Sequence, residues 1–163
     1  VTAYDDAMRL VEWPARMQAL TRGRLAETLP QGFELWLDGG HNPEGGQVIA
    51  ATLRTQAHRD PKPLHLIVGM LATKDAESFL AAFAHDAASL HAIPIPSQKI
   101  ARTPDDICAL ARNVGLTATA QESVEAALAS IMAKQNNKPA RILITGSLYL
   151  AGEILALNGT PPQ

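Results

Sequence analysis

The sequence lacks the features that mark secreted, membrane-bound or nucleic-acid-binding proteins. It has a single cysteine, Cys108, which excludes an internal disulfide and fits a reducing compartment. It has no apolar run long enough to span a bilayer, and its N-terminus does not follow the plan of a signal peptide. Its 14 basic residues are balanced by 16 acidic ones, with no long basic run. We therefore expect a cytoplasmic protein that binds neither nucleic acid nor a membrane surface.

Several motifs of ligand chemistry are also missing. No group of histidine, cysteine and acidic residues has metal-site spacing, so we predict no metal ligands in this chain. No nucleophile elbow and no Cys–His arrangement is present. Residues 40–45 have the glycine spacing of a P-loop, but Gly46 and Gln47 stand where its lysine and hydroxyl residue belong. The dinucleotide fingerprint fails as well, so no nucleotide motif is complete.

The residues that are present describe one folded domain. The chain has 163 residues, of which 47% are hydrophobic and 18% charged, enough to bury a core. From residue 35 onward, apolar strands alternate with helices about five times. This alternation is typical of a mostly parallel sheet with right-handed crossovers. We predict a Rossmann-like, three-layer α/β domain with about six strands and helices on both faces.

The sequence also places the individual elements. Residues 24–28 and 33–38 read as two strands of a hairpin around Pro30, so one strand is expected to be antiparallel. The other predicted strands are residues 64–70, 90–95, 116–120 and 141–147. The predicted helices are a tail or linker helix at 1–10, then 43–58, a helix around 79–83, 104–115, 123–134 and 148–157.

The stretch 35–46 is the one around which the chain is organised. An apolar strand ends at Asp38, and two glycines lead to Asn42, a strong helix cap, and Pro43, which suits the first helical position. The cap needs only Asn42, so this interpretation leaves Asp38 and His41 without a structural role. Open α/β sheets bind ligands at the carboxyl ends of their strands. We therefore predict that Asp38 and His41 face a ligand; the alternative is a turn that binds nothing, with Asp38 as a cap.

Other polar residues follow strands at the same predicted edge. Lys74 and Asp75 come after the strand 64–70, Ser147 ends the last strand, and Arg16 lies in a loop ahead of the sheet. Together with Asp38 they suit an anionic or nucleotide ligand. The alternatives are structural: a solvated Arg16, an exposed Lys74 before a helix capped by Asp75, and a capping role for Ser147.

Three segments together resemble the C-terminal domain of folylpolyglutamate synthase/dihydrofolate synthase, a relative of the murein peptide ligases. They are residues 14–18 (PARMQ), 37–45 (LDGGHNPEG) and 143–152 (LITGSLYLAG), with a weaker match at 68–75 (VGMLATKD). The resemblance implies that residues 1–22 are an interdomain linker with an ATP-facing loop. It implies that residues 23–163 are a murein-ligase-type C-terminal α/β domain, and that the N-terminal P-loop ATPase domain is absent from this chain.

The resemblance also implies an activity. Such an enzyme uses ATP to add L-glutamate to dihydropteroate or folate through an acyl phosphate, and its Mg²⁺ ligands are expected in the missing N-terminal domain. This chain would then be inactive alone and would act together with its own ATPase domain. It is expected to be a monomer. Two further functions stay open: the C-terminal domain of a murein peptide ligase, and a non-enzymatic nucleotide- or amino-acid-binding module.

Residue roles follow from the matched motifs. The resemblance assigns ATP contacts to Arg16 and Asp38, and catalytic roles to His41 and Lys74. Glutamate binding falls to His41, Lys74 and Ser147. The turn itself is assigned to Gly39, Gly40, Asn42 and Pro43.

Two positions depart from the family pattern. Ala15 stands where the family usually has glycine, and it is strained if that position needs a positive φ. Thr73 stands where an aspartate often precedes the lysine, which weakens the assignment of Lys74.

Overall fold

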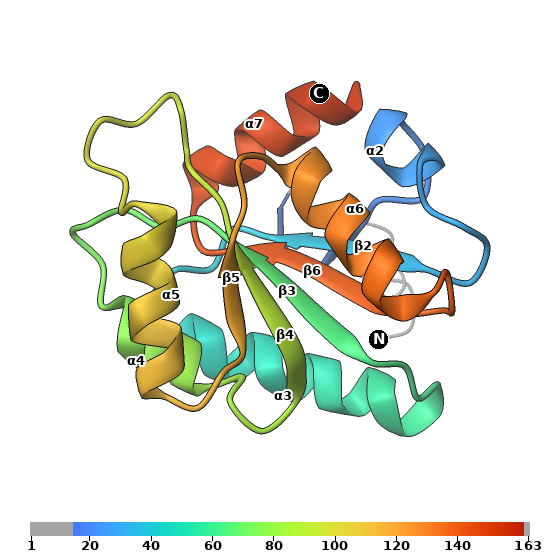
Figure 1. The fold of residues 1–163 in the computed structure, drawn as a ribbon, viewed down its shortest axis with the longest axis horizontal. Helices are drawn as coiled ribbons and strands as arrows, with labels where there is room; N and C mark the ends of the chain where they lie inside the picture. The colour runs from blue at the N-terminus through green and yellow to red at the C-terminus, as the bar shows by residue number, and fades with distance from the viewer. Residues whose placement is uncertain (1–14, 162–163) are drawn as a thin grey trace, which may run out of the picture.

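The computed structural model describes residues 15–161 as an α/β domain (Figure 1). Residues 1–14 and 162–163, and with them the predicted helix at 1–10, lie outside the described residues. The helices are α2 (Arg24–Glu27), α3 (Pro43–Arg59), α4 (Ala76–Ala81), α5 (Pro104–Asn113), α6 (Val124–Gln135) and α7 (Leu148–Asn158). The strands are β1 (Gln18–Ala19), β2 (Glu34–Asp38), β3 (Leu64–Val68), β4 (Ala87–Ala92), β5 (Ala118–Ala120) and β6 (Arg141–Thr145).

Within residues 15–161 the six strands form one sheet in the order β1-β2-β6-β3-β4-β5. The pair β1–β2 is antiparallel and every other pair is parallel. The predicted fold class is therefore confirmed: a six-stranded, mostly parallel sheet with one antiparallel pair. The last strand in sequence, β6, lies in the middle of the sheet between β2 and β3.

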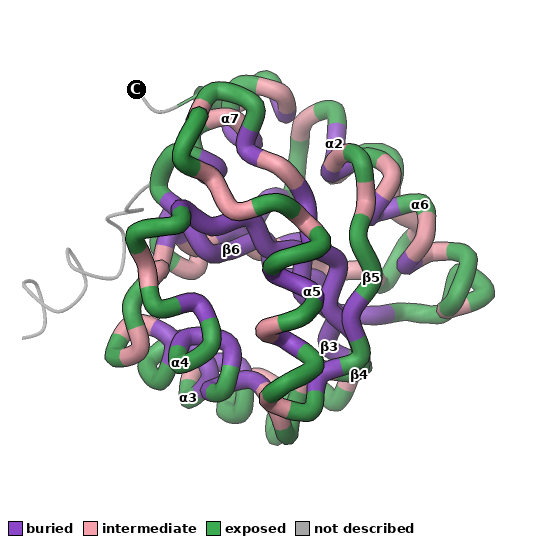
Figure 2. The backbone as a smooth tube through the Cα atoms, turned by 60° about the vertical axis from the view of Figure 1, so that its left-hand side comes forward, coloured by how far each residue is buried: buried purple, intermediate pink, exposed green. Residues whose placement is uncertain are grey.

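Helices cover both faces of this sheet (Figure 1). On β6, Leu143 packs in a core with α3, α4 and α5, while Ile142 and Ile144 pack with α2, α6 and α7. Side chains alternate across a strand, so a strand that is buried throughout supplies both cores. Figure 2 shows this burial running along the central strands, with exposed residues on the outer turns of the helices.

The prediction for residues 24–28 was wrong, because Arg24–Glu27 form helix α2 and not a strand. Gly23, at the N-cap of α2, has no side chain to cap it. The cap comes instead from Asn158, whose Oδ1 accepts from the N–H of Leu25 at 2.8 Å and from that of Ala26 at 3.4 Å.

The antiparallel partner of β2 is consequently the earlier segment β1. Gln18 pairs with Leu37, and Ala19 pairs with Trp36. β1 thus lies within residues 1–22, the segment expected to be a linker. Among the described residues, every helix is too short or too polar to cross a membrane.

Candidate functional site

Three strands end at the same level on one edge of the sheet. In the register of the parallel pairs, Thr145 of β6 stands opposite Asp38 of β2 on one side and Val68 of β3 on the other. The loops that follow these strands, residues 39–42, 69–75 and 146–147, therefore leave the sheet side by side. We call this group of loops the strand-end rim.

The loops of the strand-end rim are joined through their backbones. The carbonyl oxygen of Gly40 accepts a hydrogen bond from the N–H of Gly146 at 3.0 Å, and it lies 3.4 Å from Oγ1 of Thr145. The N–H of Gly69 donates to the carbonyl of Thr145 at 3.3 Å. The rim is thus a connected structure and not three independent loops.

Asp38 has a structural role that the sequence interpretation missed. Its Oδ2 accepts from the N–H of Met17 at 2.9 Å, and its Oδ1 accepts from the N–H of Gly40 at 2.7 Å. Burial raises the pKa of the Asp38 carboxyl, while these two hydrogen bonds and the charge of Arg16 act in the opposite direction. Asp38 is half-buried at the end of β2.

The loop that carries Arg16 is fixed against the end of β2. The carbonyl of Ala15 accepts from the N–H of Gly39 at 2.7 Å, next to the Asp38–Met17 bond. Ala15 has φ 58° and Met17 has φ 37°, in the left-handed region, so Ala15 is strained as anticipated for a residue in place of glycine. Arg16 itself is exposed beside the Asp38 carboxylate.

His41 lies in the turn between β2 and α3. Its Nδ1 is 3.1 Å from the carbonyl oxygen of Gly39, which can only accept, so Nδ1 carries the proton. In the neutral ring this leaves Nε2 with a free lone pair. Asn42 caps α3 by accepting from the N–H of Gly45 at 2.7 Å, and Pro43 is the first helical residue.

The two glycines of this turn lie close to side chains of α3 and α7. A Cβ at Gly40 would lie 2.6 Å from Cδ1 of Ile49, and one at Gly39 would overlap the side chain of Leu148. Leu148 belongs to α7, so the turn after β2 packs tightly against the helix that follows β6.

Ser147 is buried, with 4% of its surface exposed, and it caps α7. Its Oγ accepts from the N–H of Tyr149 at 3.1 Å and from that of Leu150 at 3.4 Å. Ser147 therefore has the helix-capping role that the sequence offered as the alternative to ligand binding. A hydroxyl that accepts these bonds keeps its own O–H as a donor, so capping does not prevent a ligand contact.

Lys74 lies in the strand-end rim but, within residues 15–161, forms no hydrogen bond or ion pair with the other predicted site residues. Its side chain is half-buried, and none of the ion pairs within residues 15–161 involves it. Asp75 caps α4 by accepting from the N–H of Ser78 at 3.2 Å, and hydrogen bonding from Ser78 lowers the pKa of its carboxyl. The structure thus joins Arg16, Asp38 and the turn of His41 to the loop of Ser147, and it leaves Lys74 on the same edge.

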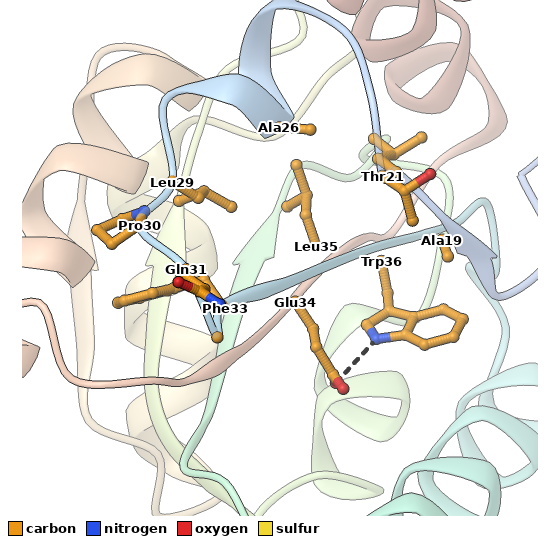
Figure 3. Close-up of a pocket in the computed structure, with 12 residues that line it drawn as sticks. Ala19, Thr21, Ala26, Leu29, Pro30, Gln31, Phe33, Glu34, Leu35 and Trp36 are labelled. Atoms are coloured by element: carbon orange, nitrogen blue, oxygen red, sulfur yellow. Dashed lines mark hydrogen bonds between the residues drawn. The ribbon is translucent and has the colours of Figure 1, made fainter.

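A separate pocket of about 350 Å³ lies between β1, α2 and the start of β2 (Figure 3). Trp36 and Glu34 border it, and the indole N–H of Trp36 donates to Oε2 of Glu34 at 3.3 Å. None of the residues predicted to bind a ligand lines this pocket, namely Arg16, Asp38, His41, Lys74 and Ser147. Within residues 15–161, no three histidine, cysteine or acidic side chains are grouped as metal ligands would be.

Comparisons with known proteins identify related domains. The model of the family described as dihydrofolate synthetase, C-terminal domain, matches residues 22–157. A comparison with curated protein sequences gave no significant match.

Solved structures of folate-conjugating enzymes have the same fold. Folylpolyglutamate synthase of Mycobacterium tuberculosis complexed with ADP superposes with a TM-score of 0.76 at 25% identity, over 94% of this chain and 34% of that one. Escherichia coli FolC in complex with DHPP and ADP gives 0.74 at 18% identity, over 96% and 34%. A bifunctional folylpolyglutamate synthase/dihydrofolate synthase with Mn, AMPPNP and L-glutamate bound gives 0.64 at 20% identity, over 90% and 32%.

The chain spans about a third of the length of these solved relatives. The family model covers most of the chain, and the sheet and its flanking helices agree with the relatives' fold. The chain therefore belongs to the family of dihydrofolate synthetase C-terminal domains, homologous to the corresponding part of folylpolyglutamate synthases.

Proposed function

We propose that this chain is the C-terminal domain of an ATP-dependent carboxylate–amine ligase, which adds L-glutamate to dihydropteroate or folate through an acyl phosphate. The observation that carries the proposal is the common level at which β2, β6 and β3 end, with Asp38, Thr145 and Val68 in register. It gives nucleotide and amino-acid ligands one shared edge. Relatives solved with ADP, with AMPPNP and with L-glutamate support the same ligand classes here.

Arg16 and Asp38 form the ATP-facing part of the proposed site. The exposed guanidinium of Arg16 offers a planar fork of donors, which suits phosphate oxygens better than a lysine would. Each oxygen of Asp38 uses one lone pair on a backbone N–H, so the second lone pair can accept from a ribose hydroxyl. The backbone bonds hold that carboxylate in one orientation.

His41, Lys74 and Ser147 form the glutamate-facing part. Lys74 supplies a positive charge for a carboxylate, and the Ser147 hydroxyl supplies a donor. His41 presents Nε2 beside the reacting groups. Catalysis in this arrangement is mostly positioning and charge stabilisation, as expected for phosphoryl and acyl-phosphate chemistry. We assign the P-loop, the Mg²⁺ ligands and most of the folate site to a separate N-terminal domain of a cytoplasmic ligase.

The proposal is tested on the full-length ligase that contains this chain. Lys74→Ala is expected to raise KM for glutamate about tenfold, the effect of losing one charge-assisted hydrogen bond, with KM for ATP unchanged. The matched control is Lys138→Ala, because Lys138 is exposed and lies just before the start of β6, at the opposite edge of the sheet.

Three results would contradict the proposal. An unchanged KM for glutamate in Lys74→Ala would remove Lys74 from the site. Turnover of nucleotide-linked muramyl substrates, with none of pteroates, would instead identify a murein ligase. Product formation from ATP, dihydropteroate and glutamate by this chain alone would show that the assigned division between domains is wrong.

A further inference from the structure

A second loop is paired with the loop that carries Lys74. The N–H of Arg102 donates to the carbonyl of Met70 at 2.8 Å, and the N–H of Ala72 donates to the carbonyl of Ile100 at 2.7 Å. Between these bonds, Leu71 and Ala101 form an isolated antiparallel bridge. The segment before α5 therefore braces the part of the strand-end rim that follows β3.

The side chain of Arg102 extends this brace to Lys74 itself. Its Nη2 donates to the carbonyl of Lys74 at 2.9 Å and to that of Ala72 at 3.3 Å. Its Nη1 pairs with Oδ2 of Asp106, in the first turn of α5, at 2.9 Å. One planar guanidinium thus joins two backbone carbonyls of the rim to a helix, which the single ammonium of a lysine cannot reproduce.

The backbone around Lys74 has further local bonds. The Lys74 N–H donates to the carbonyl of Leu71 at 3.2 Å, and the Lys74 carbonyl also accepts from the N–H of Ala76 at 3.0 Å. Arg102 is only 21% exposed, and its Nε is buried with no hydrogen-bond partner among the described residues. A buried donor without a partner costs stability, and the two carbonyl contacts are made despite that cost.

We propose that Arg102 is a positioning residue for glutamate binding: it holds the carbonyls of Ala72 and Lys74, and so fixes the direction in which the Lys74 side chain leaves the rim. Arg102 touches neither ATP nor glutamate in this role. The inference rests on the proposed glutamate-binding function of Lys74 and adds a residue to that site. Side chains placed with error of about 1 Å lose much of their effect, so loosening this loop weakens glutamate binding.

The test uses the full-length ligase with three variants. Arg102→Ala is expected to raise KM for glutamate about tenfold while KM for ATP changes less than twofold, and Arg102→Lys is expected to lie between it and the wild type. The control is Arg54→Ala. Arg54 has a comparable set of contacts away from the rim, with Nε 2.9 Å from Oδ2 of Asp86 and Nη2 3.4 Å from the carbonyl of Ala82. It should retain both KM values.

A double-mutant comparison separates this inference from the proposed function. If Arg102 acts through Lys74, then the variant lacking both side chains has the same KM for glutamate as Lys74→Ala. If Lys74→Ala raises KM and Arg102→Ala does not, the positioning role is overturned and the proposed function stands. If Lys74→Ala itself leaves KM unchanged, the proposed glutamate site fails first.

Folding of the variants is followed in parallel by circular dichroism and thermal melting. If Arg102→Ala does not fold, Arg102→Lys and Asp106→Asn carry the test, because each weakens the guanidinium contacts and keeps the side-chain volume. Equal rises in KM for ATP and glutamate in these variants would overturn the positioning role, since a general loss of structure is not selective for one ligand.

Discussion

The carboxylate of Asp38 accepts a hydrogen bond at 2.9 Å from the backbone N–H of Met17, which lies 21 residues earlier in the chain. The same carboxylate holds Gly40 through its other oxygen, at 2.7 Å. One side chain therefore fixes both the loop of Arg16 and the turn that leads to His41. Its removal is expected to affect the shape of the site as well as its charge.

Asp38→Ala and Asp38→Asn separate these two effects. In Asp38→Ala two backbone donors lose their acceptor, so we expect a loss of about 2 kcal/mol in the free energy of unfolding and a raised KM for ATP. Asp38→Asn keeps one acceptor oxygen, so it should lose less stability while still raising KM for ATP. Urea unfolding of the chain and ATP kinetics of the full-length ligase provide the measurements. An Asp38→Asn enzyme with wild-type ATP dependence would exclude Asp38 from the nucleotide site.

Gly146→Ala is expected to destabilise the chain by about 1–3 kcal/mol, because Gly146 has φ 115° and has no room for a side chain. A Cβ there would overlap the carbonyl oxygen of Gly69 and lie 2.8 Å from Cγ of Met70. Gly152→Ala is the matched control. Gly152 is an exposed residue inside α7 with open space around it, so alanine should stabilise by about 0.5–1 kcal/mol. Thermal unfolding that ranked the two variants the other way would contradict this account.

Asn158→Ala is expected to cost about 3 kcal/mol and to release α2. Asn158 is buried, and besides accepting from Leu25 it donates through Nδ2 to the carbonyl of Arg22 and to Oγ1 of Thr160, each at 2.9 Å. Its loss leaves buried backbone groups without partners. Asn113→Ala, at the exposed end of α5, should change stability by less than about 0.5 kcal/mol. Hydrogen exchange at the Leu25 amide reports directly on the cap, and unchanged protection there would contradict the prediction.

Two buried histidines form one hydrogen-bonded chain with Ser89, between β3 and β4. Nε2 of His65 donates to Oε1 of Gln135 at 3.0 Å, so its Nδ1 must accept, and the Ser89 hydroxyl donates to it at 2.6 Å. Oγ of Ser89 then accepts from Nε2 of His91 at 3.1 Å. Nδ1 of His91 in turn lies 3.4 Å from Nε2 of Gln121, which is an amide donor, so each imidazole has one accepting nitrogen and is neutral.

The stability of the chain should therefore fall in acid between about pH 6.5 and pH 4. Burial, with the charge of Lys134 and the neighbouring His65 adding to it, lowers the pKa of His91 from 6.5 to about 4. Between these values the unfolded chain binds a proton that the folded chain does not. The contribution is thus complete above pH 6.5 and is lost as the pH falls towards 4. Its size is about 3 kcal/mol, since each tenfold change in proton affinity is worth about 1.4 kcal/mol.

Urea unfolding of His91→Gln at several pH values tests this assignment. The variant should be less stable than the wild type at pH 7, because it fits the hydrogen-bonded chain less well, but its stability should vary less between pH 6.5 and 4. His85→Gln changes an exposed histidine and should keep the wild-type slope. An unaltered slope in His91→Gln would place the acid sensitivity elsewhere.

The elements that were predicted correctly are those whose helix caps or apolar runs lie within their own stretch of sequence. Asn42, Thr103 and Ser123 each cap the helix that follows them, and the apolar strands 64–68 and 141–145 are buried throughout. Helix α2 could not be found in this way, because its capping group comes from the other end of the domain. No residue within 23–28 indicates that the capping group will be the side chain of Asn158.

The geometry of the candidate site could be read from the sequence only where its signals are local. Strand ends with polar residues are visible in sequence, but the position of β6 between β2 and β3, which brings them together, is not. The bond from Asp38 to Met17 and the bonds from Arg102 to the Lys74 loop end on backbone atoms. Backbone groups are alike at every position, so no residue pattern indicates such partners.

The carbonyl of Gly40 has a consequence for how ligands would communicate. Because it is bound by the N–H of Gly146, the turn next to Asp38 cannot shift without pulling on the start of the helix capped by Ser147. In the proposed ligase, the loop beside the nucleotide-facing Asp38 and the loop of the glutamate-facing Ser147 would therefore move together.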